Sequence, residues 1–127
     1  MAQVNPDDLG LRHDLSIALQ KIGNIRVAED SLAEALDAYI VANAIDKALA
    51  AADPENAHWT RCLALSNMKV AEVAELCDSV DVARNHYAAA LRLVQTLAAQ
   101  GRLAPLDGWT LEDLRWRIAE LGDGDSS

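Results

Sequence analysis

Residues 33–42 read AEALDAYIVA and residues 81–90 read DVARNHYAAA, and these two stretches decide the fold. Each places Ala, Tyr and Ala at the same spacing, and every member lies 48 residues from its counterpart. The matched pairs are Ala35 and Ala83, Tyr39 and Tyr87, and Ala42 and Ala90. The match raises the hypothesis that the chain uses one unit twice.

The match extends well beyond these stretches, because sliding residues 5–52 over 53–100 without a gap gives 11 identities in 48 positions. The other identities are Pro6/Pro54, Leu15/Leu63, Lys21/Lys69, Asp30/Asp78, Ser31/Ser79, Leu49/Leu97, Ala50/Ala98 and Ala51/Ala99. The Pro and Asp-Ser pairs stand where helices are expected to begin or end, so they do not depend on the abundance of alanine. We predict two copies of a unit of about 48 residues, followed at 105–121 by the first helix of a third copy.

Length and composition favour one domain of packed helices. The chain has 127 residues, of which 51% are hydrophobic and only 4% aromatic, with no Phe. An aliphatic, alanine-rich core suits closely packed helices better than a β-sandwich. We therefore expect a single all-α domain over residues 1–122, with a disordered tail at 123–127.

The charge and the termini exclude several classes of partner. The net charge is −9, from 11 basic and 20 acidic residues, and a field of that sign repels nucleic acid and anionic membrane surfaces. No apolar run approaches the roughly 18 residues of a membrane span, and the opening MAQVNPDDLG lacks the features of a signal peptide. Cys62 and Cys77 are separated by about 22 Å along one expected helix and are predicted to stay reduced. We expect a cytoplasmic protein.

Helix signals divide the chain into five helices and reveal no strand. The expected helices cover residues 5–29, 31–52, 53–76, 79–100 and 110–121, with a loop at 101–109. Asp30-Ser31 and Asp78-Ser79 break the pattern at corresponding places, and Ser31 with Glu34 matches a capping box. The stretch Asp53-Pro54-Glu55-Asn56 is predicted to start the third helix.

This arrangement resembles the tetratricopeptide repeat, in which two helices per unit pack through small residues and an aromatic ring. The family's first-helix positions fall on Leu19, Ile22 and Gly23, and in the second copy on Asn67, Val70 and Ala71. The resemblance covers roughly residues 5–120 and implies a long-repeat variant similar to those of bacterial arrays. It implies antiparallel helical hairpins stacked as a short right-handed solenoid.

The resemblance also implies a groove lined by the first helix of each unit, which holds a peptide or a partner helix. The matching positions are Ile17, Gln20, Lys21, Asn24, Met68, Lys69, Glu72 and Glu75. A clamp for a peptide carboxylate is incomplete, because Gln20 stands where a Lys is expected. The alternative interpretation is that Lys21 and Lys69 are solvated and that Met68 belongs to the core.

The last expected helix offers a second candidate surface. Leu111, Leu114, Ile118 and Leu121 form one apolar stripe, and Trp116 points away from it. Trp116, with Trp109 ahead of the helix, therefore predicts a face covered by a second copy of the chain, by a partner, or by further repeats. The alternative is that Trp116 packs on the loop at 101–109.

Signs of catalysis and of cofactors are weak. His58 and Cys62 are four residues apart on one helical face, but the other candidate ligands, His13 and His86, are scattered in sequence. The chain has no glycine-rich phosphate loop, nucleophile elbow or HExxH motif. We expect neither an enzyme nor a metal or cofactor site. The predicted function is that of a protein-binding adaptor or scaffold, and the alternative is self-assembly through the terminal helix faces.

Overall fold

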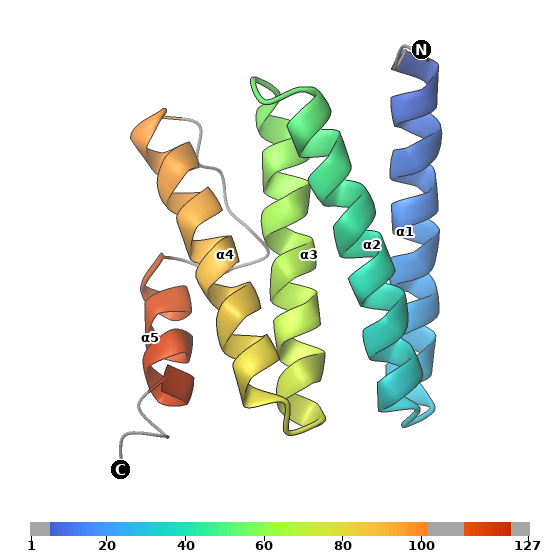
Figure 1. Cartoon of the computed structure of the whole chain (residues 1–127), viewed down its shortest axis with the longest axis vertical. Helices are drawn as coiled ribbons and strands as arrows, with labels where there is room; N and C mark the ends of the chain where they lie inside the picture. Colours follow the sequence, from blue (N-terminus) through green and yellow to red (C-terminus); the bar gives the residue numbers. More distant parts are fainter. Residues whose placement is uncertain (1–5, 102–110, 123–127) are drawn as a thin grey trace.

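The chain folds into helices that follow one another across the molecule in chain order (Figure 1). The computed structural model describes residues 6–101 and 111–122. Its helices are α1 (Pro6–Ala28), α2 (Leu32–Ala52), α3 (Ala57–Leu76), α4 (Val80–Ala99) and α5 (Leu111–Gly122). The predicted all-α fold with five helices is confirmed for these residues, and no strand occurs among them. The predicted tail, the rest of the loop after Gly101, and Asn5 lie outside the described residues.

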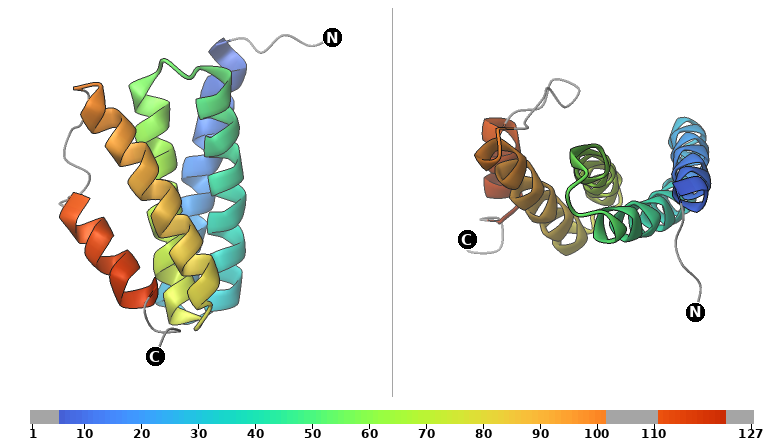
Figure 2. Two further views of the ribbon diagram at one scale, coloured as in Figure 1. Left: turned by 60° about the vertical axis from the view of Figure 1, so that its left-hand side comes forward. Right: turned by 90° about the horizontal axis from the view of Figure 1, so that it is seen from above.

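Each helix packs mainly on its neighbours in sequence: α1 on α2, α2 on α3, α3 on α4, and α4 on α5. Figure 2 shows the same row from two further directions, with α1 at one end and α5 at the other. The two end helices therefore have fewer neighbours than the three helices between them. Within the described part of the chain, every helix is either too short or too polar to cross a lipid bilayer.

The Asp-Ser breaks form the same turn twice. Asp30 and Asp78 adopt left-handed backbone angles, with φ of 63° and 61°. In the first turn, the Ser31 amide donates to the Arg26 carbonyl at 2.7 Å, and the Asp30 amide donates to the Val27 carbonyl at 2.9 Å. This pattern is the Schellman ending of a helix, which satisfies carbonyls that the last turn leaves open. Asp is among the few residues other than Gly that tolerate the left-handed conformation.

Two details of the predicted helix starts are wrong. The capping box at Ser31 does not form, because the Ser31 side chain makes no capping hydrogen bond and Glu34 pairs with Arg26 at 3.2 Å. Ser31 has ψ of 68°, outside the extended range of an N-cap. The third helix begins at Ala57 rather than at Asp53. Its cap is Asn56, whose side chain accepts from the amides of His58 and Trp59.

Small residues bring the paired helices together around the two tyrosines. Ala35, Tyr39 and Ala42 on α2 are buried, as are their counterparts on α4. Gly23 of α1 lies directly against the Tyr39 ring, which leaves no room for a side chain at that position. The larger core cluster joins α3, α4 and α5, and Leu114 is the residue buried in it among the described side chains of α5.

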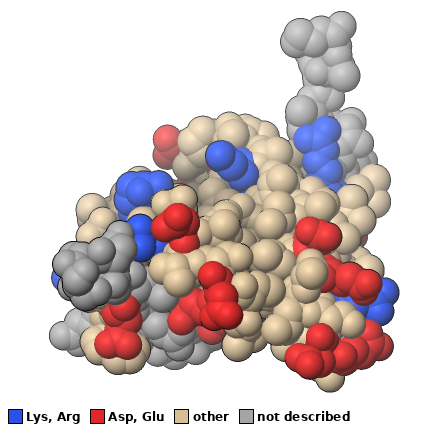
Figure 3. Space-filling view, turned by 60° about the horizontal axis from the view of Figure 1, so that its bottom comes forward, with Lys and Arg blue, Asp and Glu red and all other residues tan. Residues whose placement is uncertain are grey.

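Acidic side chains lie at the end of the molecule that carries the α1–α2 and α3–α4 turns, where Figure 3 shows them in several separate groups. Glu29, Asp30 and Asp78 are exposed at these turns. Helix α1, by contrast, carries as many basic as acidic residues along its length.

Candidate functional site

A polar cluster lies where α1, α2 and α3 meet. Ser16 of α1 and Asp46 of α2 are both fully buried. The Ser16 hydroxyl donates to Asp46 Oδ1 at 2.8 Å, while Asp46 Oδ2 has no hydrogen-bond partner among the described residues. Burial raises the pKa of Asp46, and the hydroxyls of Ser16 and Ser66 and the ring of His13 partly oppose that rise. Asp46 Oδ2 makes no hydrogen bond of normal geometry, although the Ser66 hydroxyl lies near enough to Asp46 to lower its pKa, and such a buried carboxylate is unusual in a core.

The same cluster continues onto α3 through Ser66. Asn43 of α2 donates from Nδ2 to Ser66 Oγ at 2.9 Å, and Ser66 donates to the Leu63 carbonyl at 3.1 Å. Three helices thus contribute polar side chains to one level of the molecule. Such networks fix how helices are placed relative to one another, because each group needs its partner to offset the cost of burial.

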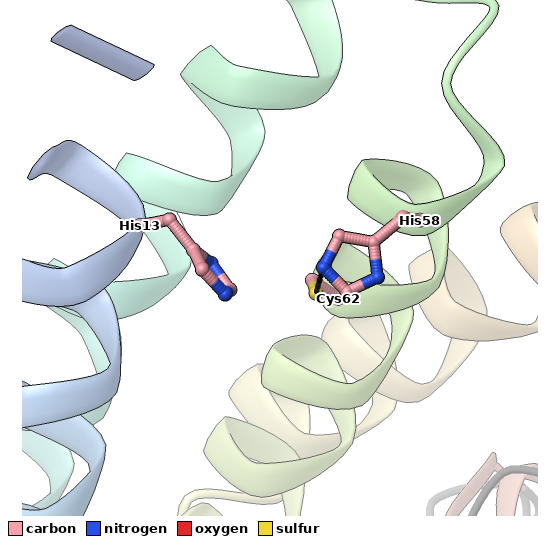
Figure 4. A group of neighbouring side chains, drawn as sticks. All are labelled: His13, His58 and Cys62. Atoms are coloured by element: carbon pink, nitrogen blue, oxygen red, sulfur yellow. Dashed lines mark hydrogen bonds between the residues drawn. The ribbon is translucent and has the colours of Figure 1, made fainter. Parts of the chain in front are cut away.

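Beside this cluster, His13 of α1 faces His58 and Cys62 of α3 (Figure 4). One ligand atom from each of the three residues lies within 4.8 Å of the other two. Cys62 Sγ is 3.7 Å from His58 Nε2, and the two imidazole rings are 5.5 Å apart between centroids. His13 Nδ1 is buried and has no hydrogen-bond partner among the described residues. The Trp59 ring, 5.0 Å from that of His13, lies against one side of this group.

The Cys62 thiol is held in its protonated form. Burial, assisted by the Asp46 carboxylate, raises the pKa of Cys62 to about 11, although Arg61 acts in the opposite direction. At neutral pH the thiol is therefore a weak nucleophile. Both Cys62 and Cys77 are half-buried and unpaired, which agrees with the expected absence of a bond between them.

The residues predicted to line a groove divide into distinct environments. Ile17, Lys21 and Asn24 are exposed on α1, whereas Met68 is buried in the core, as the alternative interpretation states. The side chains of Gln20, Lys69, Glu72 and Glu75 are half-buried.

Several of these residues bind within the molecule. Gln20 donates to Ser16 Oγ at 3.3 Å. Asn24 accepts a hydrogen bond from the Tyr39 hydroxyl, and Glu75 accepts one from the Tyr87 hydroxyl at 2.5 Å. Asn24 and Glu75 therefore anchor the two core tyrosines.

The structure has an open pocket in a different place, between α2, α3 and α4. Its lining includes Asn43, Lys47, Asn67, His86 and Arg92. His86 Nδ1 lies 2.8 Å from Asn67 Oδ1, and burial together with Lys47 lowers the pKa of His86. The residues predicted for the groove do not line this pocket.

The apolar stripe predicted for the last helix is present as far as the structure describes it. Leu114 is fully buried and Ile118 is half-buried against the core, while Trp116 is 61% exposed. Trp109 and the loop at 102–110 lie outside the described residues, as do the side chains of Leu111 and Leu121.

Sequence reasoning missed the buried polar cluster, although the proposed repeat contained a signal for it. Ser16 aligns with Ala64 and Asp46 aligns with Val94, and all four positions are buried. A carboxylate that replaces a core valine in one copy but not the other marks a place with a specific role. His13 was set aside because it is far from His58 along the chain, and only the packing of α1 beside α3 brings the two together.

Comparisons of the chain with protein-family models, with curated proteins and with solved structures found no match.

Proposed function

We propose that this chain is a protein-interaction module that assembles with a second copy through the outer face of α1. That face, which we name the α1 stripe, comprises Leu11, Leu15, Ala18, Ile22 and Ile25. In the same proposal the helices are the hairpins of a short solenoid similar to tetratricopeptide repeats, and α1 is its open end. The assembly joins two such ends.

The observation that carries the proposal is a difference between α1 and α3. Leu63, Val70 and Val73 of α3 are 9%, 0% and 4% exposed, and α2 contributes Ala35 and Tyr39 to the cluster that covers the two valines. The aligned residues on α1 are Leu15, Ile22 and Ile25, which are 53%, 44% and 55% exposed. The same face is therefore covered on α3 and open on α1.

A stripe of this kind favours another helix as its occupant. Its five residues follow one another at alternating intervals of four and three positions, which is the spacing of a coiled-coil seam. Ala18 in the middle permits close approach of two helices. Large apolar side chains in line on one surface are typical of interaction sites, whereas single ones need no explanation.

The second copy is favoured because the stripe is complementary to itself. Two α1 helices that run antiparallel around a two-fold axis near Ala18 place Asp14 of one copy opposite Lys21 of the other. Such pairs at the edge of a seam set orientation, and two-fold dimers are the commonest assemblies of identical chains. Helix α1 carries equal numbers of acidic and basic residues, whereas the rest of each chain is acidic and repels the same part of the other copy. Contact through α1 therefore avoids most of this repulsion.

The experiment compares two substitutions of equally exposed isoleucines. Ile22→Glu places a charge in the α1 stripe, and Ile40→Glu places the same charge on α2, where Ile40 is 42% exposed. We expect Ile22→Glu to abolish the dimer in light scattering after gel filtration and Ile40→Glu to preserve it. Loss of the dimer in both variants, or in neither, would contradict the assignment. Loss of the dimer in Trp116→Ala alone would move the interface to α5.

A further inference from the structure

We propose that His13, His58 and Cys62 bind one divalent transition-metal ion of the zinc class, and that the ion fastens α1 to α3. This inference does not rest on the proposed dimer. The three residues are separate from the α1 stripe, because His13 lies on the opposite side of α1 from Leu11 and Leu15. The fold creates this site, because His13 comes from α1 whereas His58 and Cys62 both come from α3.

The geometry already approaches that of a tetrahedral site. Zn–N bonds of about 2.0 Å and Zn–S bonds of about 2.3 Å place nitrogen and sulfur ligands about 3.5 Å apart. Cys62 Sγ and His58 Nε2 are 3.7 Å apart, one helical turn from each other on α3. His13 supplies the third atom from α1, and all three ligand atoms lie within 4.8 Å of one another.

A second observation points to a cation at this place. His13 Nδ1 and Asp46 Oδ2 are two of the buried polar atoms that lack a hydrogen-bond partner among the described residues, and Arg61 Nε, beside Cys62 in sequence, is another. Asp46 is fully buried, and its charge acts on both His13 and Cys62. Histidine ligands of zinc usually pass their other ring N–H to a carboxylate or carbonyl, and outer carboxylates of this kind strengthen binding. Arg61 is the positive charge that acts on Cys62 in the opposite sense.

The ligand set selects the class of metal. Imidazole nitrogens with a thiolate suit zinc and its neighbours in the transition series, whereas magnesium and calcium require oxygen ligands. Binding forms one bond from sulfur and one from each imidazole, and the Cys62 thiol proton leaves to solvent. Three protein ligands leave the fourth position of a tetrahedral ion free for water. Water can reach that position because His58 is exposed.

The ion would change how α1 is held. Helix α1 packs extensively on α2 and much less on α3, which it meets through the contacts of the His13 ring with the rings of His58 and Trp59. A bond from His13 through the metal to His58 and Cys62 ties α1 to a second helix. We therefore expect the metal to raise the melting temperature, because it binds the folded chain and the unfolded chain lacks the assembled site.

The test uses Co²⁺ as a probe of the purified, metal-free chain, because Co²⁺ adopts the same geometry as Zn²⁺ and is coloured. We expect one equivalent to produce the thiolate-to-cobalt band in the near ultraviolet together with the visible bands of a tetrahedral site. Zn²⁺ should then displace Co²⁺ and remove both. Cys62→Ser is expected to abolish the thiolate band, and Cys77→Ser, which alters the other free cysteine, is expected to keep it.

Two further variants decide whether α1 takes part. His13→Ala is expected to weaken Co²⁺ binding at least tenfold and to remove the thermal shift caused by Zn²⁺, while His86→Ala leaves both unchanged. No thiolate band in the unmodified chain, or a band that survives Cys62→Ser, would overturn the site. The group would then be a cluster of rings around Trp59 and nothing more. The thiolate band can be measured whether the chain is a monomer or a dimer, so the two proposals are tested independently. Absence of the band would contradict the metal site and not the dimer, and a monomeric chain would contradict the dimer and not the metal site.

Discussion

Gly23 shows how a single residue sets the distance between two helices. A methyl group at this position would meet Tyr39 Cε1 at 2.6 Å, and the Tyr39 ring is buried. Gly23→Ala gains about 1 kcal/mol of helix propensity, but the displaced ring costs about 1–3 kcal/mol. We expect a net loss of about 1 kcal/mol in the free energy of unfolding, measured by urea denaturation.

Gly10 provides the matched control, because nothing lies within 4 Å of the methyl group that Gly10→Ala would add. This substitution is expected to stabilise the chain by up to about 1 kcal/mol. Equal stabilisation by both substitutions would show that the Tyr39 ring does not press on α1.

The lowered pKa of His86 predicts how the stability of the folded chain depends on pH. Because burial and Lys47 lower its pKa, the folded chain takes up this proton less readily than the unfolded chain. The contribution of neutral His86 to the free energy of unfolding is therefore complete above about pH 6.5, the pKa of histidine in the unfolded chain. It declines as the pH falls toward the lower pKa that His86 has in the folded chain. His86→Gln keeps a polar group beside Asn67 but does not titrate. We expect this variant to lose less stability than the unmodified chain when the pH falls from about 7 to about 5.

The control for this experiment is Asn85→Ala, which alters an exposed residue at the same pocket and leaves every titrating group in place. It should follow the pH profile of the unmodified chain. If His86→Gln follows that profile too, His86 does not titrate differently in the folded state.

Residues whose roles follow from local spacing could be predicted from the sequence, and those that depend on lateral packing could not. Small residues near the tyrosines and the outward direction of Trp116 both follow from helical periodicity. The meeting of His13 with His58 depends on how α1 lies beside α3, which no local pattern determines. Met68 falls at a groove position by alignment, yet its side chain points into the core.

At the scale of elements, helix boundaries follow closely from turn chemistry. The Asp-Ser breaks and the glycine at position 101 mark ends that the structure places within a residue or two. The start of α3 was misplaced because Asp53, Pro54 and Asn56 are all good residues for a helix start. Asn56 is the cap because its side chain reaches two free amides, whereas Asp53 ends α2.

Among the described side chains of α5, Leu114 is buried in the core and Trp116 is exposed, which makes their contributions to stability testable. Leu114 is fully buried, and Leu114→Ala should cost about 2–5 kcal/mol because it leaves a cavity between α4 and α5. Trp116→Ala should change stability by less than about 0.5 kcal/mol, because its side chain is mainly in solvent. Urea unfolding followed by the helical circular dichroism signal measures both. A larger loss for Trp116→Ala would mean that this ring packs on the chain.

At the scale of the whole molecule, the row of helices leaves two ends, and the ends differ. Among the described side chains, α5 exposes one large apolar residue, Trp116. Helix α1 exposes four large apolar residues in the α1 stripe alone. A helix stack buries each face by adding the next helix. The open face of α1 is therefore where we propose that a further helix packs, supplied by the second copy of the chain.

The most direct test of this account is the mass of the unmodified chain by light scattering after gel filtration, from low to high micromolar concentration. A two-fold dimer through the α1 stripe predicts that the mass rises from 13.7 kDa toward twice that value and then levels off. A mass that remains at 13.7 kDa over the whole range would contradict the proposed dimer. A mass that continues to rise would contradict it as well, because a closed two-fold contact does not propagate.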